Sequence, residues 1–262
     1  DVVVACQQGG VLEERARAAG LAIEALSFRG DISPAAVLGL RRLARRLRPQ
    51  VVHAHDPHAV SASLLAVRLA PGPRLLAGRR VDFHLRGALS RWKYRSCQRV
   101  IAASRAIAQV LEADGLATSR VRVVYEGGPL REPQPGGREI LESLGVPAGA
   151  PVVGNVAALT DHKDHRTLLE AMAIVRRSLP EARLVIVGDG KLRSALEARA
   201  RGLGLAETVI FAGFRGDLDR LIPTFTVFCL SSHLEGLGTS LLDAMAFGRP
   251  IVATAAGGIP EA

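Results

Sequence analysis

Short runs of apolar and β-branched residues alternate along the whole chain with longer segments in which apolar residues recur at helical spacing. This alternation is typical of parallel sheets covered by helices, because a helix returns the chain to the starting edge before each new strand. The sequence therefore predicts an α/β fold. Strands are expected at residues 1–5, 21–26, 50–54, 74–77, 99–103 and 122–125, and in a second series at 151–156, 183–187, 208–212, 225–230 and 250–253.

Helices are expected between the strands. Over residues 37–47, Leu40, Leu43 and Leu47 recur three and four positions apart while arginines fill the other faces. The segment 165–179 has the same period.

The two series of strands are separated by a segment rich in residues that break regular structure. Residues 126–137 contain three prolines and four glycines, a composition typical of linkers. We predict two domains, at residues 1–130 and 149–262, joined by a linker at 131–148. Each is expected to be a Rossmann-like, doubly wound parallel sheet. Ligands of such sheets bind beyond the carboxyl ends of the strands, so the site is expected in a cleft between the domains.

Positive charge is concentrated in the first half of the chain. Residues 1–135 hold 21 Lys and Arg against 11 Asp and Glu (+10), whereas residues 136–262 hold 13 against 14 (−1). Aromatic residues make up only 4% of the chain, and it carries no nucleic-acid-binding motif, so nucleic acid is not an expected partner. An anionic membrane surface is expected instead, contacted through the arginines of residues 41–48, and a phosphate-bearing substrate stays open as a partner of this basic half. The alternative is a compositional bias, because 31 of the 34 basic residues are arginine.

Several patterns bear on the compartment. No apolar run approaches the roughly 20 residues of a membrane-spanning helix, and the first residues lack the order of a secretory signal. Cys6, Cys97 and Cys229 are odd in number and far apart, which argues against a disulfide framework or a zinc site. We expect a cytoplasmic protein, peripheral at the inner face of the membrane.

The richest motif follows the tenth expected strand. Gly236 and Gly238 allow backbone amides to approach a ligand, and Thr239 opens a helix whose first N–H groups favour a phosphate. Glu235 and Asp243 place two carboxylates at this helix start, where each can accept hydrogen bonds from sugar or ribose hydroxyls. Taken alone, Asp243 is equally explained by the helix dipole, and the glycines by an ordinary loop.

This segment resembles the hallmark of the GT-B glycosyltransferases of family 4, which are retaining enzymes that use nucleotide-sugar donors. The family motif places two glutamates on either side of seven residues, within the pattern S-x-x-E-G-x-G-x-x-x-L-E-A-M-A-x-G-x-P. The chain matches it from Ser232 to Pro250, and the match continues over residues 253–261. Asp243 stands where the family has its second glutamate, which shortens the arm expected to reach the ribose.

Other segments resemble the same family over nearly the whole chain. The resemblance implies two domains of the GT-B type, an N-terminal acceptor-side domain at residues 1–130 and a C-terminal nucleotide-sugar-binding domain at 149–262. The resemblance implies that Lys163 meets the donor diphosphate, that Gly188 and Gly190 form the turn beside the nucleotide base, and that His84 reaches the donor sugar from the first domain. The arginine usual in the loop before Lys163 is replaced by alanine. Without the resemblance, Lys163 and His84 are equally explained as solvated surface residues.

The resemblance implies a glycosyltransferase that moves a hexose-like or heptose-like sugar from a nucleotide diphosphate to a hydroxyl of a glycan or lipid-linked acceptor, in cell-envelope glycan or glycolipid synthesis. The nucleotide sugar is a co-substrate. No metal or other cofactor is expected, since a lysine and helix amides can stabilise the departing diphosphate. The expected catalytic residues are Glu235 and His84, and the expected donor-binding residues are Lys163, Gly188, Gly190, Gly236, Leu237, Gly238, Thr239 and Asp243.

Two other functions stay open. His53 and His55 form an H-x-H pattern after a strand, which is how several metallohydrolases begin a metal site. The other histidines fall into no ligand spacing. A noncatalytic nucleotide-sugar-binding module is the second alternative, because of Asp243 and the missing loop arginine.

Compared with the family, the chain lacks a strand and helix before residues 1–5 and further elements after residue 261. We therefore expect a fragment. The first strand of a doubly wound sheet is central, so its loss would leave an interior edge unpaired and the chain prone to aggregate. The alternative is that residues 1–5 form the first strand, followed by a loop at residues 7–10.

Overall fold

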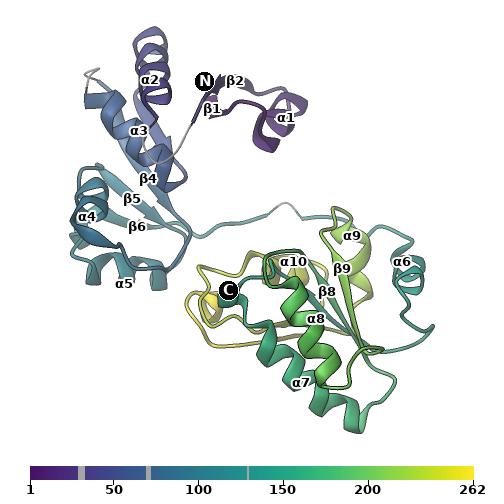
Figure 1. Cartoon of the computed structure of the whole chain (residues 1–262). Helices are drawn as coiled ribbons and strands as arrows, with labels where there is room; N and C mark the ends of the chain where they lie inside the picture. Colours follow the sequence, from purple (N-terminus) through teal and green to yellow (C-terminus); the bar gives the residue numbers. More distant parts are fainter. Residues whose placement is uncertain (29–32, 69–71, 129) are drawn as a thin grey trace. The chain divides into compact units, whose positions relative to one another are not determined.

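The computed structural model describes residues 1–28, 33–68, 72–128 and 130–262, and it divides the chain into two compact units, Asp1–Val124 and Tyr125–Ala262 (Figure 1). All described strand pairs are parallel. The predicted α/β class with parallel sheets is therefore confirmed. Residue 129 of the predicted glycine- and proline-rich segment lies outside the described residues.

The first unit divides its strands between two sheets. The smaller sheet pairs β1 (Val3–Gln7) with β2 (Ala22–Leu26), and the larger has the order β3-β4-β5-β6. Its strands are β3 (Val51–Ala54), β4 (Arg74–Arg79), β5 (Arg99–Ala102) and β6 (Val121–Val123). The helices are α1 (Val11–Ala18), α2 (Pro34–Leu47), α3 (Pro57–Arg68), α4 (Gly87–Arg95) and α5 (Arg105–Ala113). Among the described residues, the strands of this unit thus form two parallel sheets that do not pair with each other.

The second unit contains one sheet of order β11-β10-β7-β8-β9. Its strands are β7 (Val152–Val156), β8 (Arg183–Val187), β9 (Val209–Gly213), β10 (Val227–Leu230) and β11 (Ile251–Ala253). The helices are α6 (Gly137–Ser143), α7 (His165–Ser178), α8 (Arg193–Gly202), α9 (Leu218–Leu221) and α10 (Thr239–Ala246).

Helices cover both faces of this second sheet because its central strands are apolar on both sides. Along β8, Leu184 and Ile186 join a core formed with α7 and α8. The alternate residues, Val185 and Val187, join a core formed with α6, α9 and α10. Fully apolar strands of this kind are typical of parallel sheets enclosed between two helical layers.

The order of the strands creates a switch point between β7 and β10. The chain builds β8 and β9 on one side of β7, and then places β10 and β11 on the other side. The ladder between β7 and β10 contains the pairs Val153 with Val227 and Gly154 with Phe228. Beyond them β7 continues to pair with β8, and β10 with β11, so the two strands part toward their carboxyl ends. Ligands of open α/β sheets bind at such a crevice.

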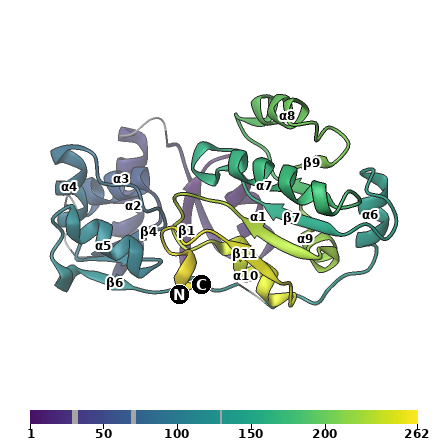
Figure 2. The ribbon, with the colours of Figure 1, turned by 90° about the horizontal axis from the view of Figure 1, so that it is seen from below.

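Within the linker predicted at residues 131–148, residues 137–143 form α6. Leu141 of this helix is fully buried in the core of the second unit together with Leu221 and Phe225. In both views α6 lies beside α9 (Figures 1 and 2). Gly137 packs directly against the backbone of Arg220, where a larger side chain would not fit.

Within the described residues, no helix combines the length and the apolar composition needed to cross a bilayer.

Candidate functional site

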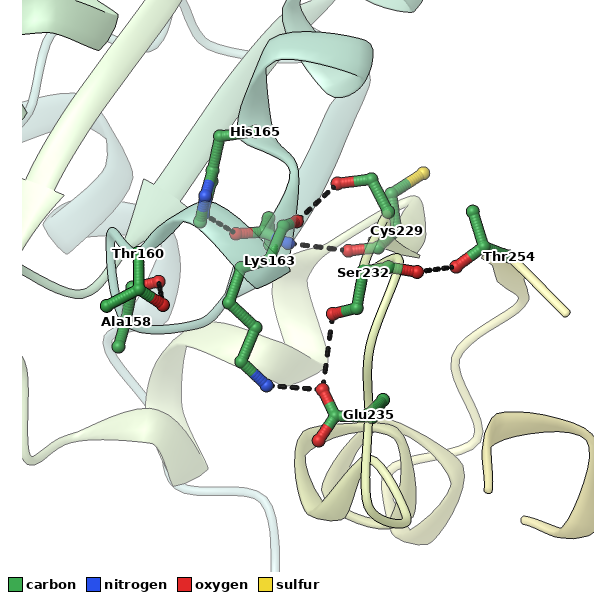
Figure 3. Close-up of polar contacts among 10 residues, drawn as sticks. Ala158, Thr160, Lys163, His165, Cys229, Ser232, Glu235 and Thr254 are labelled. Atoms are coloured by element: carbon green, nitrogen blue, oxygen red, sulfur yellow. Dashed lines mark hydrogen bonds and ion pairs between the residues drawn. The ribbon is translucent and has the colours of Figure 1, made fainter. Parts of the chain in front are cut away.

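Two of the predicted residues meet at the switch point of the second unit. Lys163 ends a short 3₁₀ turn (Asp161–Lys163) that follows β7, and Glu235 lies in the loop between β10 and α10. The Lys163 ammonium forms an ion pair with Oε2 of Glu235 (Figure 3). The two side chains are 18% and 13% exposed. The pair is therefore partly shielded from water, where its charges interact more strongly than on an open surface.

A set of hydroxyl and amide groups holds Glu235 in place. The Ser232 hydroxyl donates to Oε2 of Glu235 (3.2 Å), and the Thr254 hydroxyl donates to the Ser232 carbonyl (2.5 Å; Figure 3). The backbone N–H of Gly258 donates to the Glu235 carbonyl (2.9 Å). Residues that follow β11 thus fix the loop that follows β10.

The loop that carries Lys163 is bound directly to the loop that carries Glu235. The Ser231 hydroxyl donates to the Lys163 carbonyl (3.0 Å), and the backbone N–H of His233 donates to the His162 carbonyl (3.0 Å). Ser231 is buried. The ion pair therefore connects two loops that are already joined by uncharged hydrogen bonds.

Behind the ion pair, Asn155 and His165 bridge β7, α7 and β10. Nδ2 of Asn155 donates to the Cys229 carbonyl (2.9 Å), and Oδ1 of Asn155 lies 3.1 Å from Nε2 of His165 (Figure 3). Both side chains are almost completely buried. Burial, and to a lesser extent the charge of Lys163, lower the pKa of His165 to about 4, against a smaller opposing effect of Asp164. The imidazole is therefore neutral at physiological pH.

The glycine-containing segment leads into α10 as predicted from the sequence. Leu237 is buried, and Gly238 has a φ of 82°, in the left-handed region that glycine adopts without strain. Thr239 is the first residue of α10, whose first-turn N–H groups lack intrahelical acceptors. Asp243, which lies further along the helix, is half-buried; burial raises the pKa of its carboxyl, and the nearby Arg131 opposes this rise.

Gly188 and Gly190 lie on the neighbouring loop after β8. A side chain at Gly188 would collide with the Ala157 carbonyl, and a Cβ at Gly190 would lie 2.6 Å from the Leu159 carbonyl oxygen. Both glycines are thus required by the packing of this loop against the loop after β7. Their contact with a nucleotide base stays a prediction.

His84 belongs to the first unit. Its Nδ1 lies 2.9 Å from Oδ1 of Asp114, and Oδ2 of the same carboxylate accepts a hydrogen bond from the Leu85 backbone N–H (2.6 Å). The His84 side chain is 70% exposed. The predicted reach of His84 to a sugar held by the second unit stays a prediction.

The H-x-H pattern lies at the end of β3. The rings of His53 and His55 have centroids 4.0 Å apart, and burial lowers the pKa of His53. In the part of the chain that the structure describes, no group of three or more His, Cys, Asp or Glu residues could hold a metal ion. A metallohydrolase would need such a group. The predicted independence from metal is a separate expectation and stays a prediction.

The sequence analysis missed the residues that support the ion pair, which are Ser231, Thr254, Asn155 and His165. A signal for two of them was present. His165 lies on the same helical stripe as the buried Leu168, Leu169 and Met172. Asn155 is a polar residue within a buried strand. Polar residues at core positions need buried hydrogen-bond partners, which would have indicated an internal network.

Comparison with known proteins covers both units. The family described as Glycosyltransferase Family 4 matches residues 1–130, and the family described as Glycosyl transferases group 1 matches residues 137–262. The 2-deoxystreptamine N-acetyl-D-glucosaminyltransferase of Streptomyces fradiae is 30% identical over 84% of the chain. The lipopolysaccharide core biosynthesis glycosyltransferase LpsE of Rhizobium meliloti is 38% identical over 42% of the chain.

The chain spans 58% of the Streptomyces protein and 32% of the Rhizobium protein. Among solved structures, Anabaena HepE in complex with UDP and glucose superposes with a TM-score of 0.84 at 22% identity, over 99% of this chain and 74% of that one. This likeness extends the shared fold to nearly every residue. The chain therefore belongs to the family 4-like glycosyltransferases of the GT-B fold.

Proposed function

We propose that the chain transfers a sugar from a nucleotide diphosphate donor to a hydroxyl acceptor, with retention at the anomeric carbon. The observation that carries the proposal is the Lys163–Glu235 ion pair, which lies at the switch point beside the start of α10. One cation, one carboxylate and a helix N-terminus together match a ligand that carries both phosphate and sugar hydroxyls.

The roles follow from the chemistry of each group. An ammonium has three N–H donors, so Lys163 can hold Glu235 and still donate to a diphosphate. Together with the amides of residues 236–239 it would stabilise the charge that develops on the departing diphosphate, which is why no metal is required in this proposal. Glu235 would accept hydrogen bonds from the donor sugar. Asp243 would accept them from the ribose, and His84 would contact the sugar.

The relatives support a nucleotide-sugar donor, and their names point to acceptors of different kinds. Anabaena HepE was solved with UDP and glucose, which makes UDP-sugars the first donors to test. LpsE acts in lipopolysaccharide core biosynthesis, which supports a role in cell-envelope glycan or glycolipid synthesis. The Streptomyces enzyme is named for 2-deoxystreptamine, a small acceptor.

A donor panel tests the proposal. UDP-, GDP- and ADP-sugars are titrated calorimetrically, and the bound donor is then incubated with glycan, lipid-linked and small hydroxyl acceptors in the presence of a chelator. We expect one nucleotide to be selected and an α-linked product to form from an α-linked donor. Binding without transfer to any acceptor would favour the noncatalytic module. No binding to any nucleotide sugar would overturn the proposal.

The proposal extends to an anionic membrane surface as a partner, at the inner face of the membrane. Residues 57–111 carry 10 Lys and Arg against a single acidic residue, Asp82, a net charge of +9 that equals that of the whole chain. On α4 within this segment, Leu89 is 69% and Trp92 42% exposed. Exposed apolar residues beside arginines are typical of helices that lie in a membrane interface, with about 1 kcal/mol of attraction per basic residue.

Sedimentation with vesicles tests this surface. We expect binding to vesicles that contain phosphatidylglycerol, weaker binding in high salt, and loss of binding when Leu89 and Trp92 are both replaced by Ser. Equal pelleting with neutral vesicles would remove the membrane from the proposal. If replacement of Arg42 and Arg45 on α2 has the larger effect, the contact lies where the sequence analysis expected it, on the arginines of residues 41–48.

A further inference from the structure

The residues that join β7 and β10 beyond the end of their ladder have no part in the function proposed so far. After Gly154 and Phe228 the backbones of the two strands no longer pair. At that point Nδ2 of Asn155 donates to the Cys229 carbonyl. The side-chain amide of Asn155 thus takes the place of a ladder hydrogen bond and satisfies the Cys229 carbonyl.

The orientation of Asn155 and the tautomer of His165 determine each other. A carbonyl can only accept a hydrogen bond, so the nitrogen of the Asn155 amide must face Cys229 and its oxygen must face His165. Nε2 of His165 must therefore carry the proton that it donates to Asn155. The two hydrogen bonds therefore fix both the orientation of the Asn155 amide and the tautomer of His165. The two residues are 0% and 2% exposed.

This buried pair is connected by short stretches of chain to the two charged residues of the site. His165 is the first residue of α7 and lies two residues after Lys163. Cys229 lies six residues before Glu235. A change in the Asn155–His165 hydrogen bond would therefore shift the 3₁₀ turn of Lys163 relative to the loop of Glu235.

We propose that Asn155 and His165 are positioning residues, which set the distance between Lys163 and Glu235 for binding a nucleoside diphosphate. Neither side chain is exposed enough to touch that ligand, so both act through Lys163. This inference rests on the proposed function, because it assumes that Lys163 meets the diphosphate.

Two replacements of His165 separate hydrogen bonding from ring packing. His165→Phe keeps a ring but removes the donor, whereas His165→Gln keeps an N–H donor at a similar reach. With UDP as the probe in calorimetric titrations, we expect His165→Phe to raise the dissociation constant about tenfold or more, since a small misplacement of a binding group is costly. We expect His165→Gln to stay within about threefold of the unsubstituted chain.

A matched control accounts for lost stability. Leu205 is fully buried in the core shared with α7 and lies before β9, at the amino edge of the sheet. Leu205→Ala is expected to lower the melting temperature at least as much as His165→Phe and to leave UDP affinity unchanged. Should His165→Phe fail to fold, Asn155→Asp replaces it, because this change removes the donor to Cys229 while keeping an oxygen toward His165.

A double-mutant cycle with Lys163→Ala gives the readout that a purely structural role would not produce. If His165 acts through Lys163, then His165→Phe should weaken UDP binding strongly in the original chain and hardly at all when Lys163 is already alanine. Equal effects in both backgrounds would overturn the inference, as would unchanged UDP affinity in both His165→Phe and Asn155→Asp. If the original chain binds none of UDP, GDP and ADP, the proposed function fails, and the inference fails with it.

Discussion

The ammonium of Lys163 is paired with the carboxylate of Glu235 although 72 residues separate them in the sequence. One follows β7 and the other follows β10, the two strands between which the sheet reverses its order. Each of the two charges is therefore balanced by the other. A donor that binds here must share the Lys163 ammonium with the Glu235 carboxylate.

Lys163→Ala and Glu235→Gln are expected to differ in their effects on nucleotide affinity and on turnover. Loss of Lys163 removes a charge-assisted hydrogen bond of about 1.5–3 kcal/mol. The affinities for UDP and for the nucleotide-sugar donor should therefore both fall roughly tenfold or more. Glu235→Gln keeps its size but loses the charge that competes for Lys163. It should leave UDP binding intact or slightly tighter while turnover falls severely.

Titration of UDP and measurement of turnover in both variants check this prediction. Arg177→Ala and Glu207→Gln serve as controls, because each removes one exposed charge of the same sign. If Lys163→Ala binds UDP as tightly as the unsubstituted chain, or if Glu235→Gln turns over normally, the assignment of these two residues is wrong.

Replacement of Asp243 should change the affinity for the nucleotide itself. Asp243→Ala removes a hydrogen-bond acceptor for the ribose, and we expect UDP affinity to fall about tenfold, as for the loss of one hydrogen bond to a charged group. Asp243→Glu restores the longer arm typical of the family and should bind UDP at least as well as the original chain. Comparing UDP with free uracil in the same titrations checks the ribose contact, since uracil affinity should not change. Equal affinities for UDP in the Ala and Glu variants would contradict this role.

His165 should make the stability of the second unit depend on pH. Its folded-state pKa of about 4 lies below the ordinary value of 6.5, so between these values the unfolded chain binds a proton that the folded chain does not. The unfolding free energy is therefore complete above pH 6.5 and falls as the pH drops toward 4, by an amount on the order of 3 kcal/mol.

Chemical denaturation at pH 7 and pH 4.5, followed by backbone hydrogen exchange in β8, measures this loss. Carboxyl groups that titrate in the same range do so in every variant, so the comparison is with His165→Gln, which cannot take up the proton. We expect a smaller loss of stability in that variant. Parallel pH dependences for the two chains would show that His165 is already protonated or solvated in the folded state.

Replacement of Leu141 tests whether α6 belongs to the core of the second unit. Leu141→Ala should destabilise that unit by about 2–5 kcal/mol, because it leaves a cavity in a closely packed core. Glu142→Ala, an exposed change on the same helix, should stay within about 0.5 kcal/mol. Hydrogen exchange in β8 reports on the second unit, while fluorescence of Trp92, the only tryptophan, reports on the first. If the two variants are equally stable, residues 137–143 behave as a linker.

The sequence by itself determined the strands, the fold class and the segments that carry the site. Each depends on residues that are close together in the chain. The alternation along Arg183–Val187 is visible locally, and Gly236 and Gly238 precede the helix that they open. Lys163 and Glu235 could be singled out because each lies within a recognisable segment, although no local pattern indicated that they are paired.

Only the tertiary structure decided which of these segments meet. The order of the strands places β7 beside β10, and this alone brings Asn155, Cys229 and His165 within hydrogen-bond distance. It also decided that residues 137–143 form a helix, since Leu141 becomes buried against α9 and the residues that follow it, which begin 77 positions further along the chain (218 − 141). Contacts between distant residues depend on how the sheet is assembled, and local periodicity carries no information about that assembly.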